Sequence, residues 1–213
     1  MPLFKNEREL VSKSLSPKLK ELNYHVRVGV RLRGKHQKLK TEDSLSTAEL
    51  DIQHSLSPDI DILYWEKDYS TEPYLHAVEV KYYRYDKKTQ LHPPMYDGIG
   101  EAILLGTFGV DYIHLWHFFD PEVSDEEYYS HKHVLETALD KISMINYDCT
   151  RLTMVDKKIS NGIDYGDTLQ ALGLVMAYFL DKQKSHSYSS NSLRYNEDAK
   201  IIRNIIKKAY RIV

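Results

Sequence analysis

The chain has 213 residues, of which 42% are hydrophobic and 28% charged, and its formal net charge is -2. This length allows one well-buried domain over 1–213 and is short for two. A single cysteine, Cys149, excludes an intrachain disulfide and a Cys-rich zinc module, and no stretch approaches the roughly 20 apolar residues of a membrane span. The start, Met1 to Glu9, lacks the apolar segment of a secretory signal. We therefore expect a soluble intracellular (cytoplasmic) protein without a membrane partner, with Cys149 as a small core residue.

The first half of the chain alternates helical and extended patterns. Residues 5–22 carry leucines at near-helical spacing, and Pro17 predicts a break in that helix. Residues 24–33 alternate between apolar and basic side chains, which predicts a half-buried strand with a basic outer face. Residues 34–57 are polar and weakly patterned, so we expect a long loop near the functional site.

The middle of the chain predicts three strands and one helix. Short apolar runs indicate strands at 59–65 and 74–82, and residues 95–107 are expected to be helical despite two glycines. Residues 110–119 are apolar on both faces, which is typical of a central strand. No dinucleotide or phosphate-loop motif occurs, so we expect no organic cofactor.

The last third is predicted to be mainly helical. Ser124 is a good N-cap for a helix over 125–144, followed by a short strand at 152–155. Apolar residues at helical spacing predict helices at 168–182 and 197–212. These two helices are the candidate contact surface for a second copy.

Four charged residues lie in two of the predicted strands. Strand side chains alternate faces, so Asp59 and Asp61 share a face, and so do Glu79 and Lys81. If the two strands pair as a hairpin, the four side chains form one cluster. Carboxylates beside a lysine make a poor core but a good site for a divalent metal and a phosphodiester.

Context distinguishes this cluster from chance. The pattern acid-x-Lys occurs four times in the chain, but only Glu79-Val80-Lys81 lies in an apolar strand preceded by the dipeptide Pro58-Asp59. The alternative is an ordinary surface salt-bridge cluster, although such pairs contribute little and nothing retains them in an apolar strand.

These motifs resemble the signature of the PD-(D/E)XK nuclease superfamily, over roughly Glu7 to Phe119. The resemblance implies an α/β fold with a restriction-endonuclease-like αβββαβ core, a mixed central sheet flanked by helices, and extra C-terminal helices over about 125–213. It also implies a Mg²⁺-dependent DNA nuclease, in which Mn²⁺ can substitute. An endonuclease is favoured, with branched or structured DNA among its candidate substrates.

The resemblance also assigns roles. Asp59 or Asp61, Glu79 and the carbonyl of Val80 would hold the ion, and Lys81 would position the attacking water or neutralise developing charge. The acid of the first helix falls on Glu9 or Glu7; for Glu9, an ordinary first-turn acid is an equal alternative. Glu101 lies on the helix that follows the signature, which often carries a supporting polar residue, and a solvated helix residue is its alternative.

Basic residues are concentrated near the predicted first strand, as expected for contacts to the phosphates of DNA. Six occur between His25 and Lys40 without an acid among them: Arg27, Arg31, Arg33, Lys35, Lys38 and Lys40. A solvated strand face is the alternative. Tyr82, Tyr83 and Tyr85 are candidates for stacking on bases, or equally for hairpin packing.

Three other possibilities remain at this point. The fold could belong to a DNA-binding or assembly protein that has lost turnover, or, more weakly, to an RNA-directed or zinc-dependent enzyme. His114, His117, His131 and His133 are the candidate zinc ligands, but a strand sends His114 and His117 to opposite faces. The resemblance further implies a homodimer, since many members cut two strands with two sites.

Overall fold

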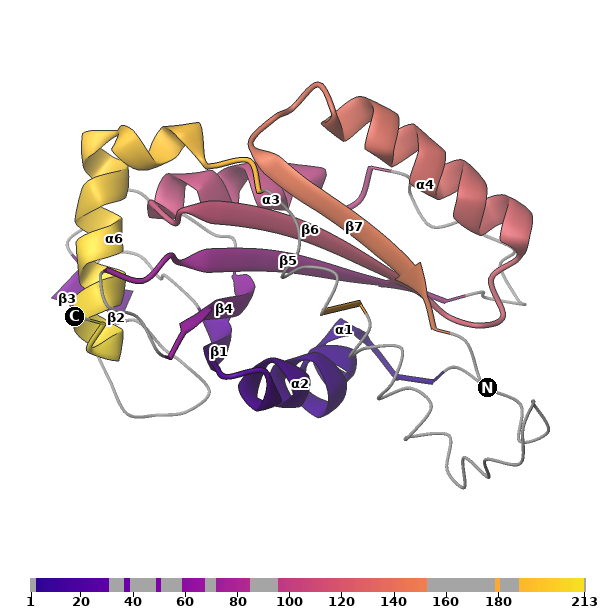
Figure 1. Cartoon of the computed structure of the whole chain (residues 1–213), viewed down its shortest axis with the longest axis horizontal. Coiled ribbons are helices and arrows are strands. Elements are labelled where there is room, and N and C mark those ends of the chain that lie inside the picture. The colour runs from indigo at the N-terminus through magenta and orange to yellow at the C-terminus, as the bar shows by residue number, and fades with distance from the viewer. Residues whose placement is uncertain are drawn as a thin grey trace.

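A five-stranded mixed sheet forms the centre of the protein (Figure 1). The computed structural model describes residues 3–30, 37–38, 49–50, 59–67, 72–84, 96–152, 179–180 and 188–212. The strands lie side by side in the order β1, β4, β5, β6, β7, antiparallel from β1 to β5 and parallel from β5 to β7. Their bounds are Tyr24–Val30 (β1), Ile60–Glu66 (β4), His76–Tyr83 (β5), Tyr112–Phe119 (β6) and Ile145–Arg151 (β7). The α/β class predicted from the sequence is confirmed.

Helices cover both faces of this sheet. In Figure 1, α1 and α2 lie on one face, whereas α3 and α4 lie on the other and α6 packs at one end. The bounds are Glu7–Leu10 (α1), Ser16–Glu21 (α2), Ile99–Leu105 (α3), Asp125–Leu139 (α4) and Glu197–Tyr210 (α6), with 3-10 turns at Gly106–Phe108 and Ser192–Tyr195. No helix in the described ranges is long and apolar enough to cross a bilayer.

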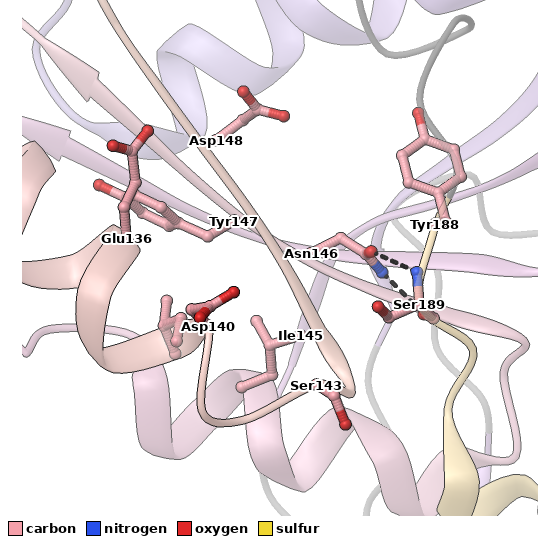
Figure 2. A pocket seen from close by; sticks show the side chains of 10 residues that line it. Glu136, Asp140, Ser143, Ile145, Asn146, Tyr147, Asp148, Tyr188 and Ser189 are labelled. Atoms are coloured by element: carbon pink, nitrogen blue, oxygen red, sulfur yellow. Dashed lines mark hydrogen bonds between the residues drawn. The ribbon is translucent and has the colours of Figure 1, made fainter.

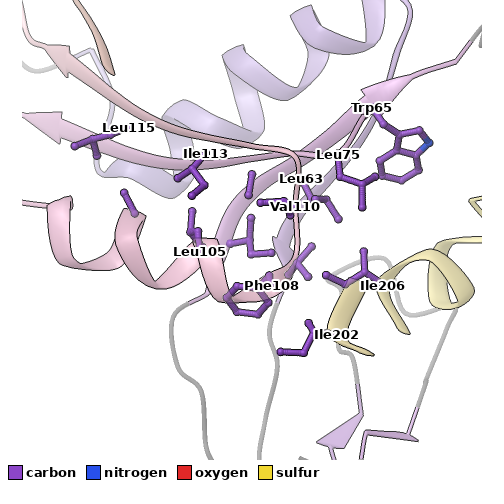
Figure 3. Close-up of a cluster of buried hydrophobic side chains, with 14 of the residues drawn as sticks. Leu63, Trp65, Leu75, Leu105, Phe108, Val110, Ile113, Leu115, Ile202 and Ile206 are labelled. Atoms are coloured by element: carbon purple, nitrogen blue, oxygen red, sulfur yellow. The ribbon is translucent and has the colours of Figure 1, made fainter. Parts of the chain in front are cut away.

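The core of the described residues consists of a large apolar cluster on each side of the sheet and a small third cluster formed by Tyr83, Phe119 and Val123. Side chains of α3 and α6 pack against one face, with Phe108 and Ile206 fully buried (Figure 3). On the other face, Leu10 and Leu15 pack against Val78 and Val80 of β5. The apolar side of α6 is therefore part of the core rather than a free surface for a second copy, and of its isoleucines Ile201 is the one left exposed.

Pro17 does not break the first helical segment. A π-helical turn, Val11–Leu15, connects α1 to α2, and Pro17 lies in the first turn of α2. Proline has no N–H to continue the α-helical bonding pattern. The wider turn in front of it keeps the chain helical, because the Ser16 N–H bonds to the Val11 carbonyl.

Three other sequence expectations differ from the structure. Short strands β2 (Gln37–Lys38) and β3 (Glu49–Leu50) pair within the predicted loop. The helix expected to reach 144 ends at Leu139, and β7 forms at Ile145–Arg151, where the sequence pattern predicts no strand. Of the predicted strand 152–155, only Leu152 is among the described residues. Alternate residues of β7 pack against α4. This tertiary contact stabilises the strand although the sequence pattern of residues 145–151 only weakly favours one. Of the predicted helix 168–182 only 179–180 is described, and it is helical and buried.

A set of ion pairs fixes α6 to the loops at one end of the sheet. Arg203 contacts Asp111 at 2.8 Å, Glu72 at 2.9 Å and the carbonyl of Gly109 at 2.9 Å. Arg194 contacts Asp111 at 3.0 Å, and Lys207 contacts Glu72 at 3.0 Å. We call this set, formed by Glu72, Asp111, Arg194, Arg203 and Lys207, the docking cluster.

Candidate active site

Two charged side chains interrupt an otherwise apolar central strand. Every residue of β5 is buried, and Glu79 and Lys81 are only 4% and 8% exposed. Val78 and Val80 point to the core under α1 and α2, so alternation places Glu79 and Lys81 on the opposite face. Burying a charged group costs free energy unless an opposite charge or a hydrogen-bond partner lies nearby. The neighbours of Glu79 and Lys81 therefore determine their charge states and their chemistry.

Asp61 joins them where the pairing of β4 with β5 ends. The described ladder runs from Tyr64↔His76 to Ile62↔Val78. One residue further along β4, the side chain of Asp61 accepts a hydrogen bond from the Val80 N–H at 2.8 Å. This bond holds the Asp61 carboxylate beside β5, near the side chains of Glu79 and Lys81.

Lys81 connects two elements of the site, β5 and α3. Its ammonium nitrogen lies 2.8 Å from Glu79 Oε1 and 2.6 Å from Glu101 Oε2 of α3. The two ion pairs fix the ammonium between β5 and the helix that follows it. The predicted neighbourhood of Asp61, Glu79, Lys81 and Glu101 is thus present in the structure.

The first helix contributes Glu7 rather than Glu9. Glu7 Oε1 accepts a hydrogen bond from the Tyr82 N–H of β5 at 3.3 Å. Glu9 lies near the surface, where it pairs with Lys13 and accepts from the Lys5 N–H, both at 2.5 Å. The structure therefore does not bring Glu9 to the predicted site, because two positions along a helix turn a side chain by more than half a revolution. We call Glu7, Asp61, Glu79, Lys81 and Glu101 the acidic cluster.

Asp59 lies just before β4 and is half-buried, and Pro58 is outside the described residues. Of the two aspartates, Asp61 is the one that bonds to the Val80 N–H. The choice between them as a metal ligand stays a prediction.

Three carboxylates of the acidic cluster, those of Glu7, Asp61 and Glu79, hold protons unusually tightly, whereas the burial of Glu101 is outweighed by its hydrogen bonds to Lys81 and Glu79, which lower its pKa. Burial raises the pKa of Asp61 to about 7, and the negative charge of Glu7 adds to this effect. Burial, followed by the charge of Asp61, raises the pKa of Glu79 to about 9 although Lys81 opposes it. Burial likewise raises the pKa of Glu7. Burial is the main cause in all three groups, and the charges of neighbouring carboxylates add to it.

Lys81 stays a cation in this environment. Burial lowers the pKa of its ammonium, but the hydrogen bonds to Glu101 and Glu79 outweigh burial and raise that pKa above its usual value. Lys81 is therefore suited to stabilise negative charge rather than to accept a proton.

The donor atoms of the cluster fit a hard divalent cation. In the described part of the chain, no three or more His, Cys, Asp or Glu side chains form a ready metal-binding group. Mg²⁺ commonly takes only one or two carboxylates and keeps several waters. Asp61 and Glu79 supply two such carboxylates, and their raised pKa values are the mark of oxygens that a cation would stabilise as anions.

The basic residues predicted to bind DNA are described only in part. Arg27 is half-buried, with its guanidinium 5.4 Å from the ring centre of Tyr210 and 6.0 Å from that of Trp65. It therefore packs against aromatic rings instead of forming a solvated outer face. Lys38 belongs to β2, while Arg31, Arg33, Lys35 and Lys40 lie outside the described residues, as does Tyr85.

The histidines form two separate pairs on opposite faces of β6. His114 Nε2 lies 3.0 Å from His76 Nδ1, and His117 Nδ1 lies 2.9 Å from His131 Nε2. His133 is exposed on α4. The four predicted zinc candidates are thus not brought together. Both pairs join residues of different elements, for which the sequence carries no local signal.

A cavity elsewhere on the protein does not belong to the acidic cluster. Figure 2 shows this hollow of about 320 Å³ at the outer edge of β7, lined by Glu136, Asp140 and Asp148 among others. At one side of the cavity, the side-chain amide of Asn146 donates a hydrogen bond to the Ser189 carbonyl and accepts one from the Ser189 N–H. None of the acidic-cluster residues is among its described lining.

Comparison with known proteins adds no family assignment. The chain matches no protein-family model, no curated protein and no solved structure.

Proposed function

We propose that the protein is a metal-dependent DNA nuclease that hydrolyses phosphodiester bonds at the acidic cluster. The observation that carries this proposal is the burial of Glu79 and Lys81, with the half-buried Asp61 hydrogen-bonded beside them, at the open end of the β4–β5 ladder. Carboxylates with raised pKa values next to a fixed ammonium suit a site for phosphoryl transfer. The packing of β5 in the core does not by itself call for charged side chains.

The order of elements supports a restriction-endonuclease-like core. From Glu7 to Phe119 the chain forms a helical segment, three antiparallel strands of the central sheet, a helix and a parallel strand. This order is consistent with the αβββαβ core that the resemblance implies, and the acidic cluster lies at the strands that carry the motifs.

In this proposal Asp61, Glu79 and the carbonyl oxygen of Val80 hold Mg²⁺, or Mn²⁺ in its place. The ion supplies Lewis-acid activation of a water and of the phosphate. Lys81 places its ammonium beside the reacting phosphate and stabilises the added negative charge, a role that needs the raised pKa seen here. Glu7 orients groups at the β5 side of the site. The basic residues that follow Arg27 in the sequence, from Arg31 to Lys40, contact DNA phosphates without reading sequence.

A cleavage assay tests the proposal. Linear, single-stranded, supercoiled and branched DNA are incubated with the purified chain in Mg²⁺, Mn²⁺ or EDTA, next to Glu79→Gln, Lys81→Met and the control Glu136→Gln at the remote cavity. We expect metal-dependent cleavage that both site variants reduce by about a thousandfold and that the control retains. Binding of every DNA without cleavage would instead support the DNA-binding or assembly protein on the same fold.

We also propose a homodimer, because cutting both strands of a duplex at one place calls for two active sites. Light scattering of the free chain and of its DNA complex measures the mass. A dimer in the complex is expected, and a monomer in both states would contradict it.

A further inference from the structure

The turn in front of α3 lies directly on the side chain of Lys81. Gly98 has φ +80° and ψ -15°, the left-handed region that favours glycine. A Cβ added at Gly98 would lie 3.0 Å from Lys81 Cε, 3.1 Å from Lys81 Cγ and 2.8 Å from Leu115 Cδ1. The left-handed backbone and the short distances to Lys81 and Leu115 both favour a residue without a side chain at position 98. The methylene groups of Lys81 occupy the space that a side chain would need.

The same helix also holds the charged end of Lys81. Glu101, three residues after Gly98, contacts the ammonium at 2.6 Å, and Glu79 contacts it at 2.8 Å from the strand. The turn itself is attached to the neighbouring strand, because the backbone of Asp97 is hydrogen-bonded to the imidazole of His117, the partner of Lys81 in the β5–β6 ladder. Stem and ammonium are therefore restrained from different sides.

We propose that the turn at 96–98, through the missing side chain of Gly98, is a positioning device that fixes the Lys81 ammonium between Glu79 and Glu101. A lysine side chain has four carbons and many rotamers, so a free ammonium seldom occupies one place. Covering the stem with backbone removes most of those rotamers before substrate arrives. Gly98 is a positioning residue, because its effect on the acidic cluster passes through Lys81.

The catalytic consequence rests on the proposed nuclease function, whereas the positioning itself does not. An ammonium held in advance stabilises charge that develops in the transition state without paying for reorganisation. Loosening it is expected to lower kcat and to leave KM nearly unchanged.

Two glycines on either side of Ile99 make a matched experiment. Gly98→Ala places a methyl group on Lys81, whereas Gly100→Ala places one where no atom lies within 4 Å. Trace acetylation followed by mass spectrometry measures the reactivity of Lys81, with the exposed Lys13 as internal reference. We expect Gly98→Ala to raise Lys81 labelling roughly fivefold or more, because its restraints open, and Gly100→Ala to leave it as in the parent chain.

Cleavage kinetics and a double-mutant cycle complete the test. With DNA substrate, Gly98→Ala should lower kcat roughly 10- to 100-fold at similar KM, and it should have little further effect once Lys81→Ala has removed the stem. Gly98→Asn, which tolerates a left-handed backbone, repeats the test with less strain should the alanine variant fold poorly.

The possible outcomes separate the two proposals. Unchanged Lys81 labelling in the folded Gly98 variants overturns the positioning role. The role is also overturned if Gly98→Ala lowers kcat by the same factor in the Lys81→Ala variant as in the parent chain. Increased labelling in a chain that cuts no DNA under any condition supports the positioning role and refutes the nuclease function.

Discussion

The protein contains two clusters of charged side chains, and they differ in their balance of charge. In the docking cluster, Glu72 and Asp111 face Arg194, Arg203 and Lys207. In the acidic cluster, four carboxylates of the described chain surround the ammonium of Lys81. Hydrogen bonds from Lys207 and Arg203 lower the pKa of Glu72, whereas burial raises the pKa of Asp61. The two carboxylates differ in both burial and neighbours: Glu72 is about half exposed and paired with two cations, whereas Asp61 is more buried and lies among other acids.

Removing a carboxylate should have opposite effects on activity and stability in the acidic cluster. Asp61→Asn and Glu79→Gln are each expected to lower DNA cleavage by about a thousandfold, while the free energy of unfolding stays equal or rises because repulsion is relieved. Cleavage rates and urea titrations measure both quantities. A variant that loses activity only in proportion to its loss of folded protein would assign Asp61 and Glu79 to structure.

The docking cluster should show the reverse. Arg203→Ala leaves Asp111, which is 5% exposed, without its 2.8 Å partner, so we expect a loss of about 3 kcal/mol in the free energy of unfolding. The kcat of the folded fraction should not change. Lys208→Ala, on the exposed side of the same helix, is the control and should be nearly neutral. A selective loss of kcat in Arg203→Ala would contradict a purely structural docking cluster.

The acidic cluster should also make the protein less stable in alkaline solution. The folded pKa values of Asp61 and Glu79, about 7 and about 9, lie above the ordinary values of 3.8 and 4.5. The folded state therefore holds these protons longer, so the stability they contribute falls as pH rises from about 4, up to about 7 for Asp61 and about 9 for Glu79, and Glu79 accounts for the part of the fall above pH 7. Above pH 7 we expect a loss on the order of 2 kcal/mol in metal-free buffer, measured by urea titration. In the double variant Asp61→Asn/Glu79→Gln, the free energy of unfolding should depend less on pH over this range. An unchanged dependence would refute the assigned pKa shifts.

The acid limb has another origin. Burial lowers the pKa of His76 and His117 to about 3 and that of His131 to about 4. The unfolded chain takes up these protons below pH 6.5 and the folded one does not, so stability falls as pH drops from 6.5 toward 4. Asp61→Asn/Glu79→Gln should make this fall steeper, because Asp61 and Glu79 of the parent chain bind protons more tightly in the folded state over the same pH range and so oppose the histidines.

The smallest contrast compares two acids of the first helix. Glu7 reaches the Tyr82 N–H, and Glu9 pairs with Lys13 near the surface. Glu7→Gln is expected to reduce kcat about tenfold and Glu9→Gln less than about twofold, measured side by side on one DNA substrate. Equal effects would show that proximity to β5 does not decide the role.

The sequence predicts the centre of the acidic cluster because the strand period is rigid. Alternation alone places Glu79 and Lys81 on one face, and the apolar pattern around them predicts a buried strand. The rotation of the first helix relative to the sheet is set by packing of Leu10 and Leu15, so the choice of Glu7 over Glu9 has no local signal. For the same reason the pair His117–His131 and the place of β7 could not be predicted: both depend on how α4 packs on the sheet.

Calorimetric titration of the metal-free chain with Mn²⁺ tests the central claim most directly, in two buffers of different ionisation enthalpy at pH 7.5. We predict about one ion per chain, bound with release of roughly one to two protons from Asp61 and Glu79, and no such binding in Asp61→Asn/Glu79→Gln. Equal binding by the parent chain and the double variant, or binding to neither, would contradict the account.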